Sequence, residues 1–384
     1  MANNRISAVA LLALLAGLAV SARADDDAMC HTGVPLVSAA TVSAMQVAES
    51  TYAGIVRNGG WAVVPGVSMQ KGDRSPGVRL LRLRLQVEGD LPGSTGFSTL
   101  FDDRVEAAVK RFQARYGVPV TGILDQYTIR TMNVPAEVRL QYVQASLQRL
   151  LAAQREAGGA PRRVTVNIPA AQIEAVENGR VAGQYRATAG SPARPSPELS
   201  MRITEVNFHP GWTVPPQIVR EDLIPRMRAD PGYLTRSGFE VLDARGKKVA
   251  VKNIDWNSNE PLRYTYRVAP GSANPLGSIR LNTPNSQSVY MHDTPSQKLF
   301  SRSIRFLSSG CVRVQGIEKL TAWLLDEPPA RVNTLVEKSG PRTVRLEQPV
   351  PVQWVYLTAW STPDNVTCFR PDIYNRMNTA VSAR

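Results

Sequence analysis

The stretch Tyr290-Met291-His292-Asp293, followed by Ser308-Ser309-Gly310-Cys311-Val312-Arg313, is the most informative part of the chain, because it places an imidazole 19 positions before a thiol. Tyr290 and His292 alternate with their neighbours, so we expect His292 to emerge on one face at the end of a strand. The thiolate is the nucleophilic form of cysteine, and a nearby histidine can take the thiol proton and later protonate a leaving amine. The spacing allows a strand, an excursion and a return, and the stretch therefore predicts acyl-transfer chemistry.

These residues resemble the catalytic domain of L,D-transpeptidases of the YkuD type. A capped subgroup of that family carries Ser-Ser-Gly-Cys after a His-Asp-Thr-Pro segment, as this chain does at 308–311 and 292–295. The resemblance covers residues 60–376 and implies an α+β multidomain protein. Its catalytic domain would be a mostly antiparallel, YkuD-like β-sandwich that acts on the peptide stems of peptidoglycan. Further segments similar to the subgroup lie at 212–215, 274–277, 356–360 and 372–374.

The resemblance also implies the roles of the site residues. Cys311 would be the nucleophile and His292 the general acid and base, with its ring oriented by the backbone carbonyl of Asp293. The Asp293 side chain either orients His292 directly or caps the following turn. Main-chain N–H groups of Ser309 and Gly310, together with that of Cys311, would form the oxyanion hole, because glycine lets the backbone approach the developing charge. Ser309 stands where many members have a second histidine, which excludes a relay through two imidazoles.

Substrate contacts are predicted more widely around the site. Arg313 matches an arginine of the family motif and either supports the loop or binds a substrate carboxylate, and its cation would lower the pKa of the thiol. For the other candidates the alternative is a turn or packing role. The remaining residues predicted to line the cleft are Tyr290, Asn274, Gly277 and Trp212.

The N-terminus predicts export. An apolar run at 8–20 precedes Ala22-Arg23-Ala24, which is typical of a signal peptide over residues 1–24. That run is shorter than the roughly 20 residues needed to span a bilayer, so we expect no membrane span after cleavage; an uncleaved signal anchor is the alternative. Cys30 lacks the small apolar residues that precede a lipoprotein cleavage site, so lipidation is not expected.

The chain of 384 residues is strongly basic, with a net charge of +13. A positive field would attract the carboxylate-rich stems of peptidoglycan, although the charge could serve solubility alone. Nucleic acid is the usual rival partner of a basic chain, but export and the lack of nucleic-acid-binding motifs argue against it. We therefore expect a periplasmic, cell-wall-associated protein whose partners are peptidoglycan stems and glycan.

Three cysteines in an oxidising compartment leave one unpaired. If Cys311 remains a thiol, Cys30 and Cys368 are the candidates for a disulfide; the alternative is that both are free. Cys30-His31 has no companion pair at ligand spacing, so no metal site is predicted. The acyl-transfer chemistry needs no cofactor.

Hydrophobic periodicity divides the mature chain. Val105, Val109 and Phe112 form the core stripe of a short helix that Asp102 or Asp103 can cap, within three helices that resemble a peptidoglycan-binding module. After residue 160 the period changes to two, with Asn178-Gly179 as a hairpin turn. The predicted divisions are a signal peptide at 1–24, an N-terminal segment packing on the other domains at 25–70, the module at 71–135, a connector helix at 136–160, the catalytic domain at 161–376 with a capping insertion at about 207–267, and a tail at 377–384.

The sequence thus predicts a peptidoglycan L,D-transpeptidase. It would release D-Ala from a tetrapeptide donor through a Cys311 thioester and form 3-3 or 1-3 cross-links. The insertion would either act as a lid that excludes water or be an inert excursion. Two rival functions stay open. Water could resolve the same thioester, as in an L,D-carboxypeptidase or endopeptidase, or the protein could be a noncatalytic wall-binding scaffold.

Overall fold

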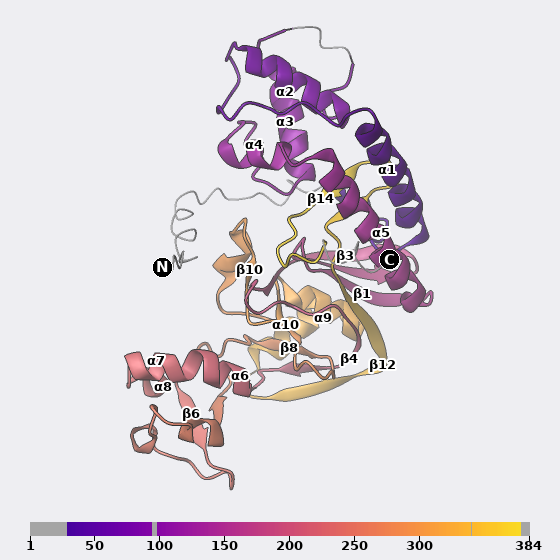
Figure 1. The fold of residues 1–384 in the computed structure, drawn as a ribbon. Coiled ribbons are helices and arrows are strands. Elements are labelled where there is room, and N and C mark those ends of the chain that lie inside the picture. The colour runs from indigo at the N-terminus through magenta and orange to yellow at the C-terminus, as the bar shows by residue number, and fades with distance from the viewer. Residues whose placement is uncertain (1–28, 94–97, 339, 378–384) are drawn as a thin grey trace, which may run out of the picture.

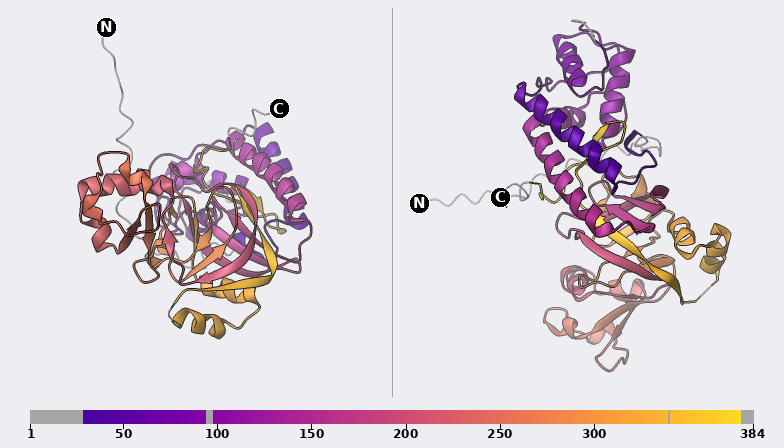
Figure 2. Two further views of the ribbon diagram at one scale, coloured as in Figure 1. Left: turned by 90° about the horizontal axis from the view of Figure 1, so that it is seen from below. Right: turned by 90° about the vertical axis from the view of Figure 1, so that its right-hand side faces the viewer.

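The computed structural model describes residues 29–93, 98–338 and 340–377, and the predicted signal peptide at 1–24 lies outside them. Three separate hydrophobic cores organise these residues: one in the helical N-terminal part, one in a large sheet and one in the insertion. In Figures 1 and 2 the helical part and the insertion lie at opposite ends of the molecule, with the sheet between them. The described helices include none that is both long and apolar enough to cross a bilayer.

Capping residues set the starts of several helices in the first core. Asp102 and Asp125 accept hydrogen bonds from backbone N–H groups of the first turn, so of the two caps expected for α3 (Asp103–Arg115), Asp102 or Asp103, the first is confirmed. Gly158 ends the last helix in the left-handed conformation that favours glycine. The helices are α1 (Ala39–Arg57), α2 (Pro76–Val87), α3 (Asp103–Arg115), α4 (Gln126–Met132) and α5 (Ala136–Ala157).

The C-terminal hairpin packs in this helical core, although it lies within the residues 161–376 predicted for the catalytic domain. β13 (Ala359–Ser361) and β14 (Thr367–Phe369) pair with each other and contribute buried side chains to the first core. The Phe369 ring stacks on Tyr116 of the module, with 5.0 Å between ring centroids. A disulfide joins Cys30 to Cys368 and ties the N-terminal segment to the same hairpin.

The second core lies within a sheet of nine strands in the order β10-β3-β11-β9-β8-β4-β12-β1-β2. Because β3 also pairs with β2, the ladder closes into a ring, and the mostly antiparallel, β-rich domain that the sequence predicted is confirmed. Most pairs are antiparallel, and the parallel ones are β1 with β12, β10 with β3 and β11 with β9. The strands are β1 (Arg162–Asn167), β2 (Gln172–Glu177), β3 (Arg180–Gly190), β4 (Leu199–Phe208), β8 (Ile279–Asn282), β9 (Met291–His292), β10 (Phe306–Ser308), β11 (Val312–Val314) and β12 (Arg342–Val355).

Helices and turns complete this domain. The predicted hairpin turn at Asn178-Gly179 joins β2 to β3, with both residues at positive φ. Side chains of α9 and α10 join the core of the sheet, so the apolar face of each helix is buried. The helical elements are α9 (Ile317–Leu325), α10 (Pro329–Glu337) and the 3-10 turn η5 (Gln297–Ser301).

The insertion, which we call the cap, folds around a core of its own. It starts later than the predicted residue 207, because Asn207 and Phe208 still pair with β8 and β12 in the main sheet. Its strands form a small sheet in the order β5-β7-β6. The elements of the cap are β5 (Trp212–Thr213), α6 (Pro216–Ile218), the π-helical turn η2 (Val219–Leu223), α7 (Ile224–Ala229), α8 (Tyr233–Arg236), β6 (Phe239–Leu242), the 3-10 turns η3 (Val251–Asn253) and η4 (Glu260–Arg263), and β7 (Thr265–Val268).

Candidate active site

The register of three short strands gathers the candidate residues. On β9, His292 pairs with Arg280 of β8 on one side and with Arg313 of β11 on the other. Directly paired residues of adjacent strands point to the same face of a sheet. Because side chains alternate along a strand, Cys311 and Tyr290, each two residues earlier, continue this face. The fold therefore places the thiol and the imidazole on one side of the sheet.

The imidazole of His292 is almost completely buried, with 4% of the residue exposed. Nδ1 lies 2.5 Å from the carbonyl oxygen of Asp293, the group expected to orient the ring. Burial, and next the charge of Arg313, lower the pKa of His292 to about 3, although hydrogen bonds to the carbonyls of Asp293 and Leu276 act in the opposite direction. The ring is therefore neutral at physiological pH and can accept a proton.

The side chain of Asp293 does not orient His292 but organises the neighbouring loop. Its carboxylate accepts hydrogen bonds from Ser278 N (2.8 Å) and from Nε2 of Gln297 (3.1 Å). Of the two sequence alternatives for this side chain, the structure therefore favours the one that stabilises the local turn. Gly277 lies directly against this carboxylate, because a Cβ at this residue would stand 2.2 Å from Oδ2 of Asp293.

Two residues predicted to line the cleft have structural roles instead. Gly277 has a positive φ (63°), and its lack of a side chain lets its backbone approach the Asp293 carboxylate closely. Asn274 is fully buried, and its Nδ2 donates to the carbonyls of Pro210 (2.8 Å) and Ala269 (3.1 Å). These carbonyls lie at the start and the end of the cap, so Asn274 fastens the base of the cap with both N–H groups of its amide.

Cys311 is the single free cysteine of the described residues and is partly exposed. Burial raises the pKa of its thiol to about 11, although a hydrogen bond with the Tyr290 backbone and the charges of Arg313 and Arg280 act to lower it. No hydrogen bond in the described part of the chain joins Sγ to the ring of His292. The resting site thus holds a neutral thiol and a neutral imidazole, not a preformed ion pair.

The loop before the thiol is fixed by hydroxyl groups. Ser308 Oγ donates to the Cys311 carbonyl oxygen (2.5 Å) and accepts from the N–H of Gly310 (3.2 Å). The Gly310 N–H, predicted to serve the oxyanion hole, is therefore already engaged. Within the described residues, the N–H groups of Ser309 and Cys311 donate no hydrogen bond to protein and remain available for a developing oxyanion.

Ser196 is a functional-site residue that the sequence analysis missed. It is completely buried, donates through Oγ to the Gly310 carbonyl oxygen (2.7 Å) and accepts from Gly190 N (2.9 Å). The hydroxyl of Tyr374 donates to the Gly190 carbonyl (2.6 Å) and accepts from Ser196 N (3.2 Å). Tyr374 belongs to a segment that resembled the family, whereas Ser196 lies in a proline-rich connection that carried no signal. Together they hold residues 308–311 against the end of β3. We call these residues the loop of the nucleophile, after the role predicted for Cys311.

A cavity of about 990 Å³ separates the cap from the loop of the nucleophile. Ser308 and Ser309 lie on one wall, and the predicted Trp212 lies on the other, together with residues of η2 and α7. Trp212 forms a hydrogen bond with the phenol of Tyr290. Burial, and next the nearby Cys311, raise the pKa of this phenol. Tyr290 thus connects the cavity wall with the thiol, and both predicted residues lie where a substrate could contact them.

Arg313 lies near the thiol of Cys311 and has a hydrogen-bond donor without a partner among the described residues. Its Nε is buried and has no hydrogen-bond partner among the described residues. Burial lowers the pKa of Arg313, and the nearby Cys311 raises it. A buried guanidinium N–H without a partner costs free energy until an acceptor binds. This arrangement suits a carboxylate or carbonyl of a bound ligand.

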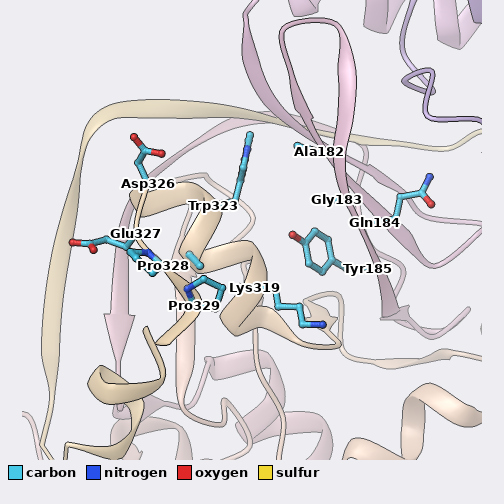
Figure 3. A pocket seen from close by; sticks show the side chains of 11 residues that line it. Ala182, Gly183, Gln184, Tyr185, Lys319, Trp323, Asp326, Glu327, Pro328 and Pro329 are labelled. Atoms are coloured by element: carbon cyan, nitrogen blue, oxygen red, sulfur yellow. The ribbon is translucent and has the colours of Figure 1, made fainter. Parts of the chain in front are cut away.

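A second hollow of about 650 Å³ is unrelated to the thiol. Figure 3 shows its wall, where Tyr185 of β3 and Lys319 of α9 lie across from Asp326 and Pro329. The hollow lies at the part of β3 that pairs with β2, whereas residues 187–190 of the same strand pair with β10 and β11. The candidate chemistry is therefore at the other end of this strand. The described residues contain no cluster of three or more His, Cys, Asp or Glu side chains suited to a metal ion.

Comparison with known families matches two parts of the chain. Residues 161–345 match the model of the YkuD family, described as "L,D-transpeptidase catalytic domain", and residues 74–132 match that of a "Putative peptidoglycan binding domain". A Haemophilus influenzae protein named "Putative L,D-transpeptidase" is 34% identical over 215 residues. That match covers 55% of this chain and 44% of the relative, so the chain spans less than half the length of this relative.

Solved structures of L,D-transpeptidases from several bacteria match part of the chain at low identity. An L,D-transpeptidase from Mycobacterium smegmatis is 16% identical, with 51% of this chain and 59% of that chain covered and a TM-score of 0.25. The L,D-transpeptidase of Stackebrandtia nassauensis is 14% identical, with coverages of 76% and 97% and a TM-score of 0.27. That of Xylanimonas cellulosilytica is 16% identical, with coverages of 74% and 96% and a TM-score of 0.24.

Proposed function

We propose that this protein, which carries an L,D-transpeptidase catalytic domain of the YkuD family and a peptidoglycan-binding domain, is an exported enzyme that cross-links peptidoglycan stem peptides. One observation carries the proposal. The thiol of Cys311 and the neutral imidazole of His292 share a face of the sheet, and Ser308 and Ser309, just before the thiol, line a cavity of about 990 Å³, a size suited to a peptide. Water resolving the same intermediate would give a carboxypeptidase or an endopeptidase.

The reaction has two steps: a thioester forms in the first and is consumed in the second. The Cys311 sulfur attacks the carbonyl of the third residue of a tetrapeptide donor, a diamino acid, and His292 takes the thiol proton. The tetrahedral intermediate expels D-Ala, whose amine receives the proton from His292. The amine of a second stem then attacks the thioester, a new amide forms, and the sulfur leaves and is protonated again. No oxidant or reductant is required.

The neutral resting pair decides how the proton moves. Because the pKa of the thiol is raised to about 11 and that of His292 is lowered to about 3, a thiolate–imidazolium pair is unfavourable before substrate binds. Proton transfer therefore accompanies the attack on the carbonyl. A neutral imidazole has one N–H and the imidazolium has two, so the carbonyls of Asp293 and Leu276 stabilise the protonated ring that forms.

Charged and backbone groups stabilise the rest of the reacting centre. Arg313 and Arg280 both act to lower the pKa of Cys311, so they stabilise negative charge on sulfur. The buried Nε of Arg313 would bind a carboxylate of the donor stem. The N–H groups of Ser309 and Cys311 would hold the oxyanion.

The remaining parts of the chain support an action on the cell wall. Residues 74–132 would hold glycan through polar side chains of their loops, because the apolar stripe of α3 is buried in the core. The net charge of +13 would concentrate the protein on the acidic polymer. With the signal peptide predicted at 1–24, this favours a periplasmic location.

The test is to incubate the purified protein, with its disulfide intact, with disaccharide tetrapeptides and to measure product masses. Cross-linked dimers with loss of D-Ala support the transferase. Shortened monomers alone indicate a hydrolase. A noncatalytic scaffold would give neither product and would not be acylated by a carbapenem. Persistent activity of a folded Cys311→Ala variant would overturn the assignment of the nucleophile.

A further inference from the structure

Arg194, in the connection between β3 and β4, joins the cap to the loop of the nucleophile. Its Nη1 and Nη2 each lie 2.6 Å from a carboxylate oxygen of Asp222, and its Nε lies 2.8 Å from Oε2 of Glu221. The same Nη1 donates to Oγ of Ser309 (3.0 Å), two residues before the thiol. A single guanidinium thus binds two carboxylates of one segment and a hydroxyl of the other.

The π-helical turn of the cap provides this arrangement. Glu221 and Asp222 are consecutive residues of η2, and both reach the same guanidinium. π-helical turns within α-helices are rare and occur often at functional sites. The Arg194 side chain is 20% exposed, and those of Glu221 and Asp222 are 40% and 42% exposed. The contact therefore lies at the border of the cavity, where solvent can reach the carboxylates but the guanidinium is sheltered.

Besides the hydrogen bond between Trp212 and Tyr290, two further contacts attach the cap to the rest of the protein. Asn274 fastens its base through the carbonyls of Pro210 and Ala269. Across the cavity, the ion pairs of Arg194 are the only ones in the described chain that connect the cap (212–268) with another part. The base can act as a hinge, and the Arg194 contact is a reversible polar link at the opposite wall of the cavity.

We propose that Arg194 is a positioning residue that latches the cap over the loop of the nucleophile and so favours transfer of the acyl group to an amine over hydrolysis. This inference rests on the proposed function for its chemistry. A bidentate pair of arginine and carboxylate has a fixed geometry that a lysine does not reproduce. While the latch is closed, bulk water is kept from the thioester. The hydroxyl of Ser309 is held at the same time, next to a backbone N–H assigned to the oxyanion.

The latch is tested in the full-length, disulfide-bonded protein with four variants. Arg194→Ala removes the latch. Arg194→Lys keeps the positive charge but cannot form the bidentate contact with Asp222. The double variant Arg194→Asp with Asp222→Arg reverses the pair and restores attraction across the cavity. Arg220→Ala is the matched control, because Arg220 precedes the acid pair in η2, is exposed and forms no ion pair among the described residues. Thermal unfolding verifies that each variant is folded.

Two measurements are made on each variant. The first is hydrogen–deuterium exchange over residues 216–229, which reports opening of the cap without any need for activity. We expect exchange to accelerate by about tenfold in Arg194→Ala, by less in Arg194→Lys, and not in Arg220→Ala. The second is the ratio of dimers to hydrolysed monomers. We expect this ratio to fall by about tenfold in Arg194→Ala and to recover in part when the pair is reversed.

The outcomes separate this inference from the proposed function. If Arg194→Ala exchanges as the wild type does, the latch does not exist and the inference is wrong, whatever the enzyme makes. If exchange accelerates but the product ratio stays constant, Arg194 is merely structural and the positioning role is also wrong. If the wild type forms no thioester, the proposed function fails, and with it the effect on products, while the exchange data still show whether the latch holds the cap.

Discussion

Arg313 and His292 are register partners across the parallel strands β11 and β9. The guanidinium therefore lies beside the imidazole and, after burial, is the largest cause of the lowered pKa of His292. Arg280 pairs with the same histidine from β8. Two cations flank a ring that must stay neutral to act as a base, and both also act to lower the pKa of Cys311. The sheet thus prepares a base and partly stabilises the future thiolate with the same pair of side chains.

The first prediction concerns the reactivity of Cys311 towards iodoacetamide. Because its pKa is raised to about 11, the thiolate fraction at pH 7 is on the order of 10⁻⁴. We expect the alkylation rate to rise about tenfold per pH unit from pH 6 to pH 9, without a plateau. Cys311→Ser gives the background rate, since Cys30 and Cys368 are joined in the disulfide. A plateau below pH 8 would show an activated thiolate and contradict the neutral resting pair.

The second prediction separates the ring of His292 from the side chain of Asp293. His292→Ala should reduce the rate of acylation by about 10² to 10⁴, the usual contribution of a general base. Asp293→Asn should lose much less, because the backbone carbonyl contacts the ring while the carboxylate contacts Ser278 and Gln297. Stopped-flow acylation by a carbapenem measures both. Equal losses in the two variants would mean that the carboxylate takes part in the proton transfer.

The third prediction is that Ser196 supports the loop of the nucleophile. Ser196→Ala leaves the buried Gly310 carbonyl and Gly190 N–H without their partner, which should lower the free energy of unfolding by about 1–3 kcal/mol. Acylation should slow at the same time, because the backbone at Gly310 loses a restraint. Ser200→Ala, an exposed serine nearby, is the control and should change stability by less than about 0.5 kcal/mol. Urea denaturation compares the two variants.

The fourth prediction is a pH dependence of stability from Glu174. Burial raises its pKa to about 7 from 4.5, although hydrogen bonds from Leu36 N and Gln184 and the charge of Arg163 act to lower it. Below pH 4.5 the carboxyl is protonated in both states, so its contribution to stability is complete. As the pH rises from 4.5 to 7 the unfolded chain loses the proton first, and the free energy of unfolding falls by about 3 kcal/mol in total.

Glu174→Gln should abolish this loss, because the amide is neutral throughout and keeps an oxygen for the N–H of Leu36. Urea midpoints at pH 5, 6, 7 and 8 test it. Glu177→Gln is the matched control on the same strand, since that side chain is 42% exposed, and it should retain the wild-type fall in stability. An unchanged slope in Glu174→Gln would mean that the buried carboxyl keeps an ordinary pKa.

Local chemistry made a large part of the fold predictable. The helix caps at Asp102 and Asp125, the hairpin turn at Asn178-Gly179 and the end of the connector helix at Gly158 each depend on residues within a few positions. Positive φ and side-chain caps act over one turn of chain, so the sequence is sufficient to place them. The α+β class, with a helical module and a β-rich domain, followed instead from the resemblance of the motifs to a known family.

Several residues predicted for the site make structural contacts that the sequence analysis did not foresee. Asn274 and Gly277 lie in a family-like segment, yet one fastens the base of the cap and the other makes room for Asp293. The Gly310 N–H, predicted for the oxyanion hole, donates a hydrogen bond to Ser308 Oγ. The partners are main-chain carbonyls for Asn274, the Asp293 carboxylate for Gly277 and a neighbouring hydroxyl for Gly310, and these contacts follow only from the completed fold.

From the sequence alone, a thiol and an imidazole were predicted to belong to one site, because alternation along a strand gives the face of His292 and the motif at 308–311 points to Cys311 as the nucleophile. Their protonation states and surroundings depend on the tertiary structure. Burial and the two paired arginines set the pKa values, while Ser196 and Arg194 reach the loop of the nucleophile from more than a hundred positions away. Desolvation and charge depend on distance in space, and distance in space is not a property of local sequence.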